Sequence, residues 1–150
     1  MLYFLPTSIS DAVNLISHGA VPLAGGTVLV KKILEFKSIP GKIADLRLLK
    51  ELKGINVVND HLEIGAMTPL SEILESPLLT AGEFSAFGKA VHSIGNPHIR
   101  QMGTVGGNIL LHSPLADLRP VFLSFNGQAL LLYPDEKNKW VPVEDLWSSS

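Results

Sequence analysis

Cysteine is absent from the 150 residues of this sequence. Without a thiol the chain can form no disulfide, no thiolate nucleophile and no thiolate-bound iron–sulfur cluster. A strong charge imbalance is also absent, because 12 basic and 14 acidic residues leave a formal net charge of -2. No cluster of Lys and Arg is present to attract nucleic acid or an anionic membrane, so we expect neither as a partner. Any redox chemistry would have to come from a bound cofactor.

Long apolar runs are missing as well, although 46% of the residues are hydrophobic. No run approaches the roughly 20 residues that a helix needs to cross a bilayer. The opening residues, MLYFLP, lack the basic region and the small-residue cleavage site of a secretory signal. We therefore expect a soluble, cytoplasmic chain with a packed core, organised as one ordinary domain or two small lobes.

The histidines do not form a metal-binding pattern. None has a second ligand at the spacing typical of a zinc site, and no cysteine accompanies them. We therefore expect no metal site in this chain. The residues expected at surface or loop positions are His18, His61, His92, His98 and His112.

The first third of the chain has the pattern of a strand, a glycine turn and a helix, preceded by another helix. Ser8 or Ser10 can cap the first helix, and Gly19 can end it in a left-handed conformation. Apolar periodicity predicts the elements in this order: helix 9–16, strand 21–24, glycine turn 25–27, helix 28–35, strand 42–46 and a helical turn 48–52.

A lobe boundary is predicted near Gly54, where the pattern changes to that of a hairpin. The pair Asn59-Asp60 separates two short strand-like runs, which is typical of a tight turn. The stretch 94–108 has little periodicity, and long irregular segments in compact domains tend to be functional. The other expected elements are strands 55–58 and 61–64, helices 68–74, 84–93 and 116–122, and paired strands 128–133 and 140–143.

The glycine turn at residues 25–27 has the composition of a phosphate-binding loop. Unpaired backbone N–H groups and the positive end of a helix dipole favour an anion there, and glycine lets the backbone approach it closely. Thr27 adds a hydroxyl donor, and a diphosphate needs no lysine when backbone amides bind it. A structural alternative stays open, because Gly25-Gly26 alone also fits a tight turn that requires positive φ.

A second glycine-rich loop lies within the irregular stretch. Thr104, Gly106, Gly107 and Asn108 offer a hydroxyl, closely approachable amides and a carboxamide within five residues. Two such loops in one small chain predict a clamp that holds a pyrophosphate between them.

Several side chains near these loops have more than one interpretation. The carboxylate of Asp117 could accept hydrogen bonds from sugar hydroxyls, or it could cap a helix or pair with Arg119, and the residues favour neither reading. For Arg100 we favour a structural role, in which it holds the loop through backbone carbonyls, over a phosphate contact. Trp140 and Trp147 lie beyond the loops and are expected in the core or in an interface.

With these motifs the sequence resembles a known family, the FAD-binding medium subunits of the molybdenum hydroxylases. That family includes carbon monoxide dehydrogenase and bacterial xanthine dehydrogenase. The order and spacing of several blocks are more specific than any single glycine motif. The blocks are LAGGTVL at 23–29, LEIGAMTPLSEI at 62–73, IGNPHIRQMGTVGGN at 94–108 and SPLADL at 113–118.

The resemblance implies an α+β chain with the two-lobed FAD-binding fold of the PCMH type. A small parallel βαβ lobe would span residues 1–54, and a larger, mostly antiparallel sheet with helices would span residues 55–150. FAD would lie in the cleft between the lobes. Family members usually continue into a C-terminal domain that touches the isoalloxazine, and that domain is absent from these 150 residues.

The resemblance also implies which residues contact FAD. The first loop would surround the pyrophosphate, the second would hold phosphates and sugar or ribityl hydroxyls, and a third group would lie near the flavin. No catalytic side chain is implied, because the isoalloxazine carries the electrons. The implied contacts are Leu23, Ala24, Gly25, Gly26, Thr27, Val28 and Leu29; then Thr104, Gly106, Gly107, Asn108 and Asp117; and finally Ile94, Gly95 and Leu111.

The implied function is that of the flavin subunit of an oxidoreductase, relaying electrons from iron–sulfur clusters through FAD to NAD or another acceptor. The clusters would lie on an iron–sulfur subunit and the substrate on a molybdenum-cofactor subunit, since this chain has no cysteine. Val28 departs from the family, which often has an acidic or polar residue there. That departure motivates an alternative, a non-catalytic assembly module of the same fold that binds flavin weakly or not at all.

Overall fold

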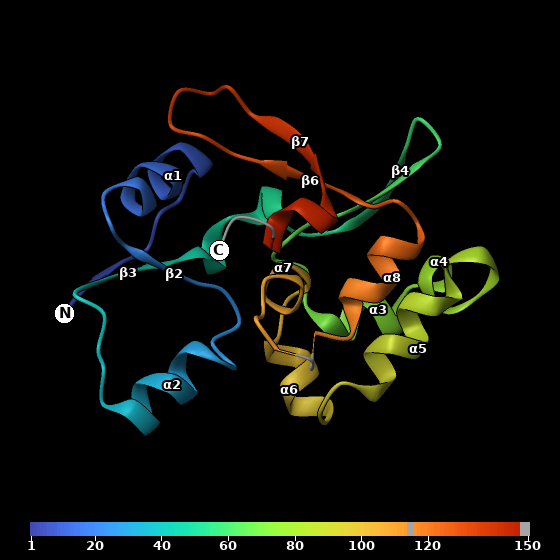
Figure 1. Ribbon diagram of the computed structural model, residues 1–150, viewed down its shortest axis with the longest axis horizontal. Coiled ribbons are helices and arrows are strands. Elements are labelled where there is room, and N and C mark those ends of the chain that lie inside the picture. The colour runs from blue at the N-terminus through green and yellow to red at the C-terminus, as the bar shows by residue number, and fades with distance from the viewer. Residues whose placement is uncertain (114–115, 148–150) are drawn as a thin grey trace.

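The computed structural model describes residues 1–113 and 116–147. A three-stranded parallel sheet with strand order β1-β3-β2 occupies the first part of the chain (Figure 1). This sheet and its helices confirm the small parallel βαβ unit expected from the sequence. Its elements are β1 (Leu2–Phe4), α1 (Ile9–Ser17), β2 (Val21–Leu23), α2 (Leu29–Phe36) and β3 (Lys42–Asp45).

Local signals explain where α1 begins and ends. The Ser8 hydroxyl accepts a hydrogen bond from the Asp11 N–H at 3.1 Å, which caps the first turn. Gly19 follows the helix with a φ of +85°, a conformation that glycine adopts without steric cost. Of the two serines that the sequence allowed as caps, the structure uses Ser8.

The chain leaves the parallel sheet through two short 3-10 turns, η1 (Leu46–Leu48) and η2 (Lys50–Leu52). Beyond them, the N–H of Gly65 donates to the Gly54 carbonyl at 2.9 Å. A Cβ on Gly65 would lie 2.3 Å from the Leu52 carbonyl oxygen, so only glycine permits this close approach. The second part of the chain therefore packs directly against the turn that ends the first.

Two antiparallel hairpins belong to the second part. Asn59 and Asp60, with φ of +48° and +61°, form the tight turn that was expected between the strands at residues 55–58 and 61–64. Among the described residues the strands form two separate pairs, and not the one larger sheet that the family resemblance implied. The alternation of apolar and polar residues along a strand shows which face of the strand is buried, but it does not show which hairpins join into one sheet. The strands are β4 (Ile55–Val58), β5 (His61–Ile64), β6 (Gln128–Leu131) and β7 (Lys139–Pro142).

Helices contribute more residues to the second part than strands do, and together with the sheets they confirm the α+β class. The stretch 94–108, predicted to be irregular, contains two short helices. Asn96 caps the first by accepting from the Ile99 N–H at 3.0 Å, and helices this short leave little apolar periodicity to detect. The helices are α3 (Leu70–Glu75), α4 (Pro77–Thr80), η3 (Gly82–Phe84), α5 (Ser85–Ser93), α6 (Pro97–Met102), α7 (Val105–Ile109), α8 (Leu118–Ser124) and η4 (Val143–Trp147).

Thr68 and Pro69 differ from the sequence prediction, which made them the cap and first residue of a helix. α3 begins at Leu70, and the buried Thr68 hydroxyl instead bonds to the backbone of Gly54, accepting at 2.9 Å and donating at 3.1 Å. Pro69 pairs with Thr104 in an isolated antiparallel bridge. This bridge holds the second glycine loop against the start of α3.

The hydrophobic core lies in the second part, where both hairpins pack on the helices. Phe87 and Phe122 meet edge to face with ring centroids 5.0 Å apart. In residues 1–113 and 116–147, no helix has the length and apolarity that a membrane span requires. The buried core residues are Leu70, Ile73, Leu79, Phe87, Val91, Ile94, Val105, Ile109, Leu118, Val121 and Val143.

Candidate functional site

The first glycine loop leaves the carboxyl end of β2 and turns into α2. Gly26 turns the chain with a φ of +74°, and its carbonyl accepts a backbone hydrogen bond from the helix. The N-cap residue Val28 makes no side-chain cap. Within the described part of the chain, no hydrogen bond uses the N–H of Gly25, Gly26 or Thr27. These donors stay available to an external acceptor at the positive end of the α2 dipole.

The second loop lies directly against the first. A Cβ on Gly25 would lie 1.8 Å from the Met102 carbonyl oxygen and 3.0 Å from the Gly103 Cα. Met102 is the last residue of α6, and Gly103 leads into α7. The backbones meet where Gly25 leaves room, so the first loop lies beside the residues that lead into the second.

The first amides of α7 are already used inside the protein. Gly106 donates its N–H to the Ala66 carbonyl at 2.8 Å, and Gly107 donates its N–H to Thr104 Oγ1 at 3.2 Å. The sequence indicated that the amides of this loop would be free to approach a ligand. For these two glycines that expectation is wrong, because a distant segment and the loop's own cap supply the acceptors.

The two glycines of α7 have different surroundings. A Cβ on Gly106 would lie 2.9 Å from both the Cβ and the carbonyl oxygen of Ala66, so this glycine permits close packing. Gly107 is exposed, and a Cβ there would meet only Thr104 Oγ1, at 2.9 Å. Gly107 therefore presents bare backbone at the surface, where a ligand can lie close to the chain.

Thr104 offers the amide that the second loop still has free. Its bridge to Pro69 is made by hydrogen bonds of the flanking residues, 2.9 and 3.0 Å long. The N–H of Thr104 is not a donor in any hydrogen bond between described residues, although Thr104 is buried. Pro69 and Thr104 form a non-hydrogen-bonded antiparallel pair, and in such a pair a backbone N–H points away from the partner strand. The Thr104 N–H therefore faces away from residue 69.

Asp117 has neither of the structural partners that the sequence allowed. It occupies the N-cap position of α8, but its side chain makes no capping hydrogen bond, and Arg119 donates to backbone carbonyls instead. The next residue, Leu118, donates its N–H to Asn108 Oδ1 at 3.1 Å and so ties α8 to the second loop. The half-buried Asp117 carboxylate stays available to accept hydrogen bonds from sugar hydroxyls.

Arg100 has the structural role that the sequence favoured. Its Nη1 donates to the carbonyls of Ile94 and Gly95 at 2.9 and 3.4 Å. Gly95 has a φ of +48°, which marks a sharp turn between α5 and α6. The guanidinium therefore fixes the turn where two of the expected flavin contacts lie.

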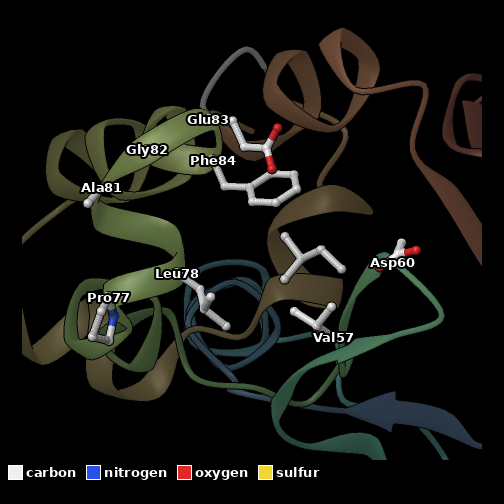
Figure 2. A pocket seen from close by; sticks show the side chains of 9 residues that line it. Val57, Asp60, Pro77, Leu78, Ala81, Gly82, Glu83 and Phe84 are labelled. Atoms are coloured by element: carbon white, nitrogen blue, oxygen red, sulfur yellow. The ribbon is translucent and has the colours of Figure 1, made fainter.

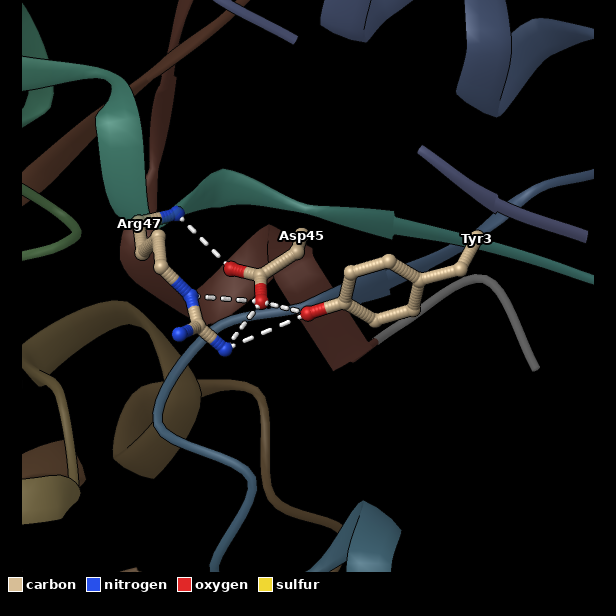
Figure 3. A network of polar contacts seen from close by, with 3 residues as sticks. All are labelled: Tyr3, Asp45 and Arg47. Atoms are coloured by element: carbon tan, nitrogen blue, oxygen red, sulfur yellow. Dashed lines mark hydrogen bonds and ion pairs between the residues drawn. The ribbon is translucent and has the colours of Figure 1, made fainter. Parts of the chain in front are cut away.

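A buried carboxylate lies at the carboxyl end of β3. Asp45 is 1% exposed and accepts hydrogen bonds from the Tyr3 hydroxyl and from Arg47 Nε, the latter at 2.7 Å (Figure 3). Burial alone would raise the pKa of Asp45, but hydrogen bonds from Arg47 and Tyr3 outweigh it and hold the pKa below 3.8. Asp45 pairs in register with Leu23, the last residue of β2. The network therefore steadies the strand end from which the first glycine loop departs.

Acid should weaken the Asp45 network. Because the pKa of Asp45 is lower in the folded than in the unfolded chain, its stabilising contribution is complete above about pH 4 and is lost as the pH falls through the folded pKa. Asp45→Asn should lower the free energy of unfolding at pH 7 by about 1 to 2 kcal/mol, an amount limited by the exposure of Arg47. Urea unfolding between pH 2 and 7 measures both effects. An unchanged acid slope in the variant would contradict this account.

Two hollows lie away from the glycine loops. One of about 530 Å³ lies between the β4–β5 hairpin and the α4–η3 segment (Figure 2), and one of about 570 Å³ lies between β5, β6 and Phe87. Trp140, expected in the core or an interface, is exposed on the wall of the second. Asp60 and Glu83 line the first hollow, and Asp60 and Glu63 line the second. These carboxylates repel phosphate, so the glycine loops suit an anion better.

Sequence reasoning missed three features of the site. The Met102 carbonyl against Gly25 and the Ala66 carbonyl against Gly106 join segments far apart in the chain, and no local pattern indicates them. The Asp45 network did have a signal. The strand at residues 42–46 was predicted, and Asp45 lies near its end. A carboxylate buried at such a strand end needs hydrogen-bond partners, which is the signal that could have indicated the network.

Known proteins resemble this chain in sequence. The chain matches, over residues 1–150, the family model described as the FAD binding domain in molybdopterin dehydrogenase. It is 34% identical over 119 residues to the nicotinate dehydrogenase FAD-subunit of Eubacterium barkeri, covering 77% of this chain and 40% of that protein. It is 32% identical over 151 residues to the carbon monoxide dehydrogenase medium chain of Afipia carboxidovorans, covering 99% and 52%.

Solved structures share the fold. The reconstituted CO dehydrogenase from Oligotropha carboxidovorans matches with a TM-score of 0.90 at 31% identity, covering 97% of this chain and 51% of that one. A carbon monoxide dehydrogenase from Hydrogenophaga pseudoflava matches with a TM-score of 0.88 at 29% identity, covering 96% and 50%. The chain thus spans about half the length of these relatives.

Proposed function

Since the chain belongs to the family of FAD binding domains in molybdopterin dehydrogenases, we propose that it is the FAD-binding part of an oxidoreductase subunit. When bound, FAD supplies the electron relay, from iron–sulfur clusters to NAD or another acceptor. The chain itself binds and orients the cofactor. No side chain of the site has to act as a general acid or base.

The composition bears on the partners of this chain. The 150 residues contain no cysteine to hold an iron–sulfur cluster, so they would receive electrons from clusters held elsewhere. We propose an iron–sulfur subunit and a molybdenum-cofactor subunit as the partners. The names of the relatives, FAD-subunit and medium chain, support this proposal because they describe parts of larger assemblies.

The free amides at the start of α2 carry the proposal. A diphosphate is doubly suited to this place, because the N–H groups of Gly25, Gly26 and Thr27 can donate to it and the helix dipole favours its charge. The contact of Gly25 with Met102 sets the second loop beside the same amides. The bound diphosphate would therefore lie between the two loops.

Each group of residues has its own part in the proposed site. The first loop binds the diphosphate, Thr104 and Gly107 face it from the other loop, and Asp117 accepts from sugar or ribityl hydroxyls. Gly106 and Asn108 act by packing and by holding α8. The proposed set is Leu23, Ala24, Gly25, Gly26, Thr27, Val28, Leu29, Ile94, Gly95, Thr104, Gly106, Gly107, Asn108, Leu111 and Asp117.

Two lobes would hold the cofactor, residues 1–54 and 55–150. The parallel sheet ends at Asp45, before this boundary, and the buried core cluster begins at Leu70, after it. The first loop belongs to one lobe and the second loop to the other, so FAD bound at their contact would bridge both.

Comparison of FAD with riboflavin tests the proposal directly. Riboflavin carries the isoalloxazine and ribityl chain but no phosphate, so it cannot use the amides of the first loop. We expect FAD to bind at least about 100-fold more tightly than riboflavin, a difference of about 2.7 kcal/mol. Calorimetric titration of the purified chain measures both affinities. Equal affinities would contradict the diphosphate site, and failure to bind either flavin would favour the assembly-module alternative.

A further inference from the structure

Three side-chain donors converge on the turn that follows α7. Arg119 Nε donates to the Ile109 carbonyl at 2.9 Å, and Arg119 Nη2 donates to the Leu111 carbonyl. Trp147 Nε1 donates to the same Ile109 carbonyl at 3.2 Å. Arg119 lies on α8 and Trp147 on η4, so two separate elements hold one turn.

The two donor side chains also stack on each other. The guanidinium carbon of Arg119 lies 4.1 Å from the centre of the Trp147 ring, and both residues are half-buried. Such a cation–π contact restricts the planar guanidinium while its fork of N–H groups points at the two carbonyls. A lysine carries a point charge and cannot reproduce either the fork or the stacking plane.

The Ile109 carbonyl requires external donors because α7 ends at this residue. The last carbonyls of a helix have no partner within it, and a positive charge at this end is also favourable to the dipole. α7 has only five residues, too few to be stable without tertiary support. Arg119 and Trp147 therefore stabilise the short helix that carries Gly107.

The same contacts reach two of the expected FAD contacts in the second lobe. Leu111, an expected flavin contact, is one of the two residues held through its carbonyl. Asp117 lies two residues before Arg119, and Leu118 between them is tied to Asn108 at 3.1 Å. Loss of the arginine contacts would release the turn and the start of α8 together.

We propose that Arg119 and Trp147 form a positioning clamp that determines how tightly the chain binds FAD. The clamp acts through Leu111, Asp117 and the α7 backbone and does not itself contact the cofactor. This inference rests on the proposed function, because it takes FAD as the ligand of the adjoining loops.

Conservative variants test the clamp. We expect Arg119→Lys to weaken FAD binding about tenfold, or 1.4 kcal/mol. Trp147→Phe keeps an aromatic ring but loses the Nε1 donor, and a loss of about threefold is expected. In both variants without FAD, amide hydrogen exchange of residues 110–113 should become faster, because the turn opens more often.

Val121→Ala is the matched control. Val121 lies on α8, like Arg119, but its side chain belongs to the hydrophobic core. We expect this variant to lower the melting temperature yet to keep the FAD affinity and the exchange rates of the turn. A purely structural role for Arg119 would make the control and Arg119→Lys behave alike, and that result would overturn the clamp. Wild-type protein that binds no FAD would instead refute the proposed function. In that case the hydrogen-exchange rates of residues 110–113 would still test whether Arg119 and Trp147 hold the turn.

Discussion

Gly25→Ala is expected to abolish FAD binding and to destabilise the chain. The added methyl group would lie 1.8 Å from the Met102 carbonyl oxygen, and a backbone atom cannot move aside as a flexible side chain does. The two loops would have to separate, and overpacking of this kind costs about 3 kcal/mol or more. We expect FAD affinity to fall more than about 100-fold, because the amides of the first loop would no longer face the second loop. Urea unfolding and FAD titration measure the two effects.

Gly41→Ala is the control for this variant. Nothing lies within 4 Å of a Cβ at Gly41, and this glycine has no positive φ. We expect the free energy of unfolding of Gly41→Ala to stay within about 0.5 kcal/mol of the wild-type value, as for most surface substitutions. If Gly25→Ala were equally harmless, the close contact between the loops would not exist in solution.

Gly107→Leu should have the opposite balance, with a large loss of binding and little loss of stability. Gly107 is exposed, but a Cβ there would lie 2.9 Å from the Thr104 hydroxyl that caps α7, so the cap must shift at a cost of about 1 kcal/mol. Leucine offsets this cost, because its helix propensity is better than that of glycine by up to about 1 kcal/mol. The side chain would, however, occupy the bare surface on which FAD is proposed to lie. We expect the FAD affinity to fall about 100-fold or more, a change of about 2.7 kcal/mol.

A leucine elsewhere on a helix separates this effect from a general one. Lys89 lies exposed on α5, outside the proposed site, so Lys89→Leu adds the same side chain without blocking the loops. We expect this control to bind FAD like the wild type. Full FAD affinity in Gly107→Leu would remove α7 from the cofactor site.

The sequence was sufficient for those features of the fold that depend on neighbouring residues. The Ser8 cap, the Gly19 stop and the Asn59-Asp60 turn follow from side-chain chemistry within a few residues, and the structure has all of them. The parallel unit around the first glycine loop likewise follows from periodicity. The sequence could not show that β5 and β6 do not pair with each other. The alternation of apolar and polar residues along a strand does not indicate which strand lies beside it.

The candidate site divides in the same way. The glycine pattern indicated the free amides of the first loop, since a glycine turn between strand and helix leaves them unpaired. In the second loop the same pattern misled, because the carbonyl of Ala66 accepts from Gly106 across a large sequence separation. Glycine composition shows that the backbone can come close to something. It does not show whether the partner is a ligand or the protein.

Backbone amide NMR of the chain during an FAD titration tests the central claim most directly. We expect the 1H–15N resonances of Gly26 and Thr27 to shift strongly, since their N–H groups would donate to the diphosphate. The resonance of Gly106, whose N–H already donates to Ala66, should change less. Shifts confined to the hollow around Phe87 and Trp140, with Gly26 and Thr27 unaffected, would contradict the account.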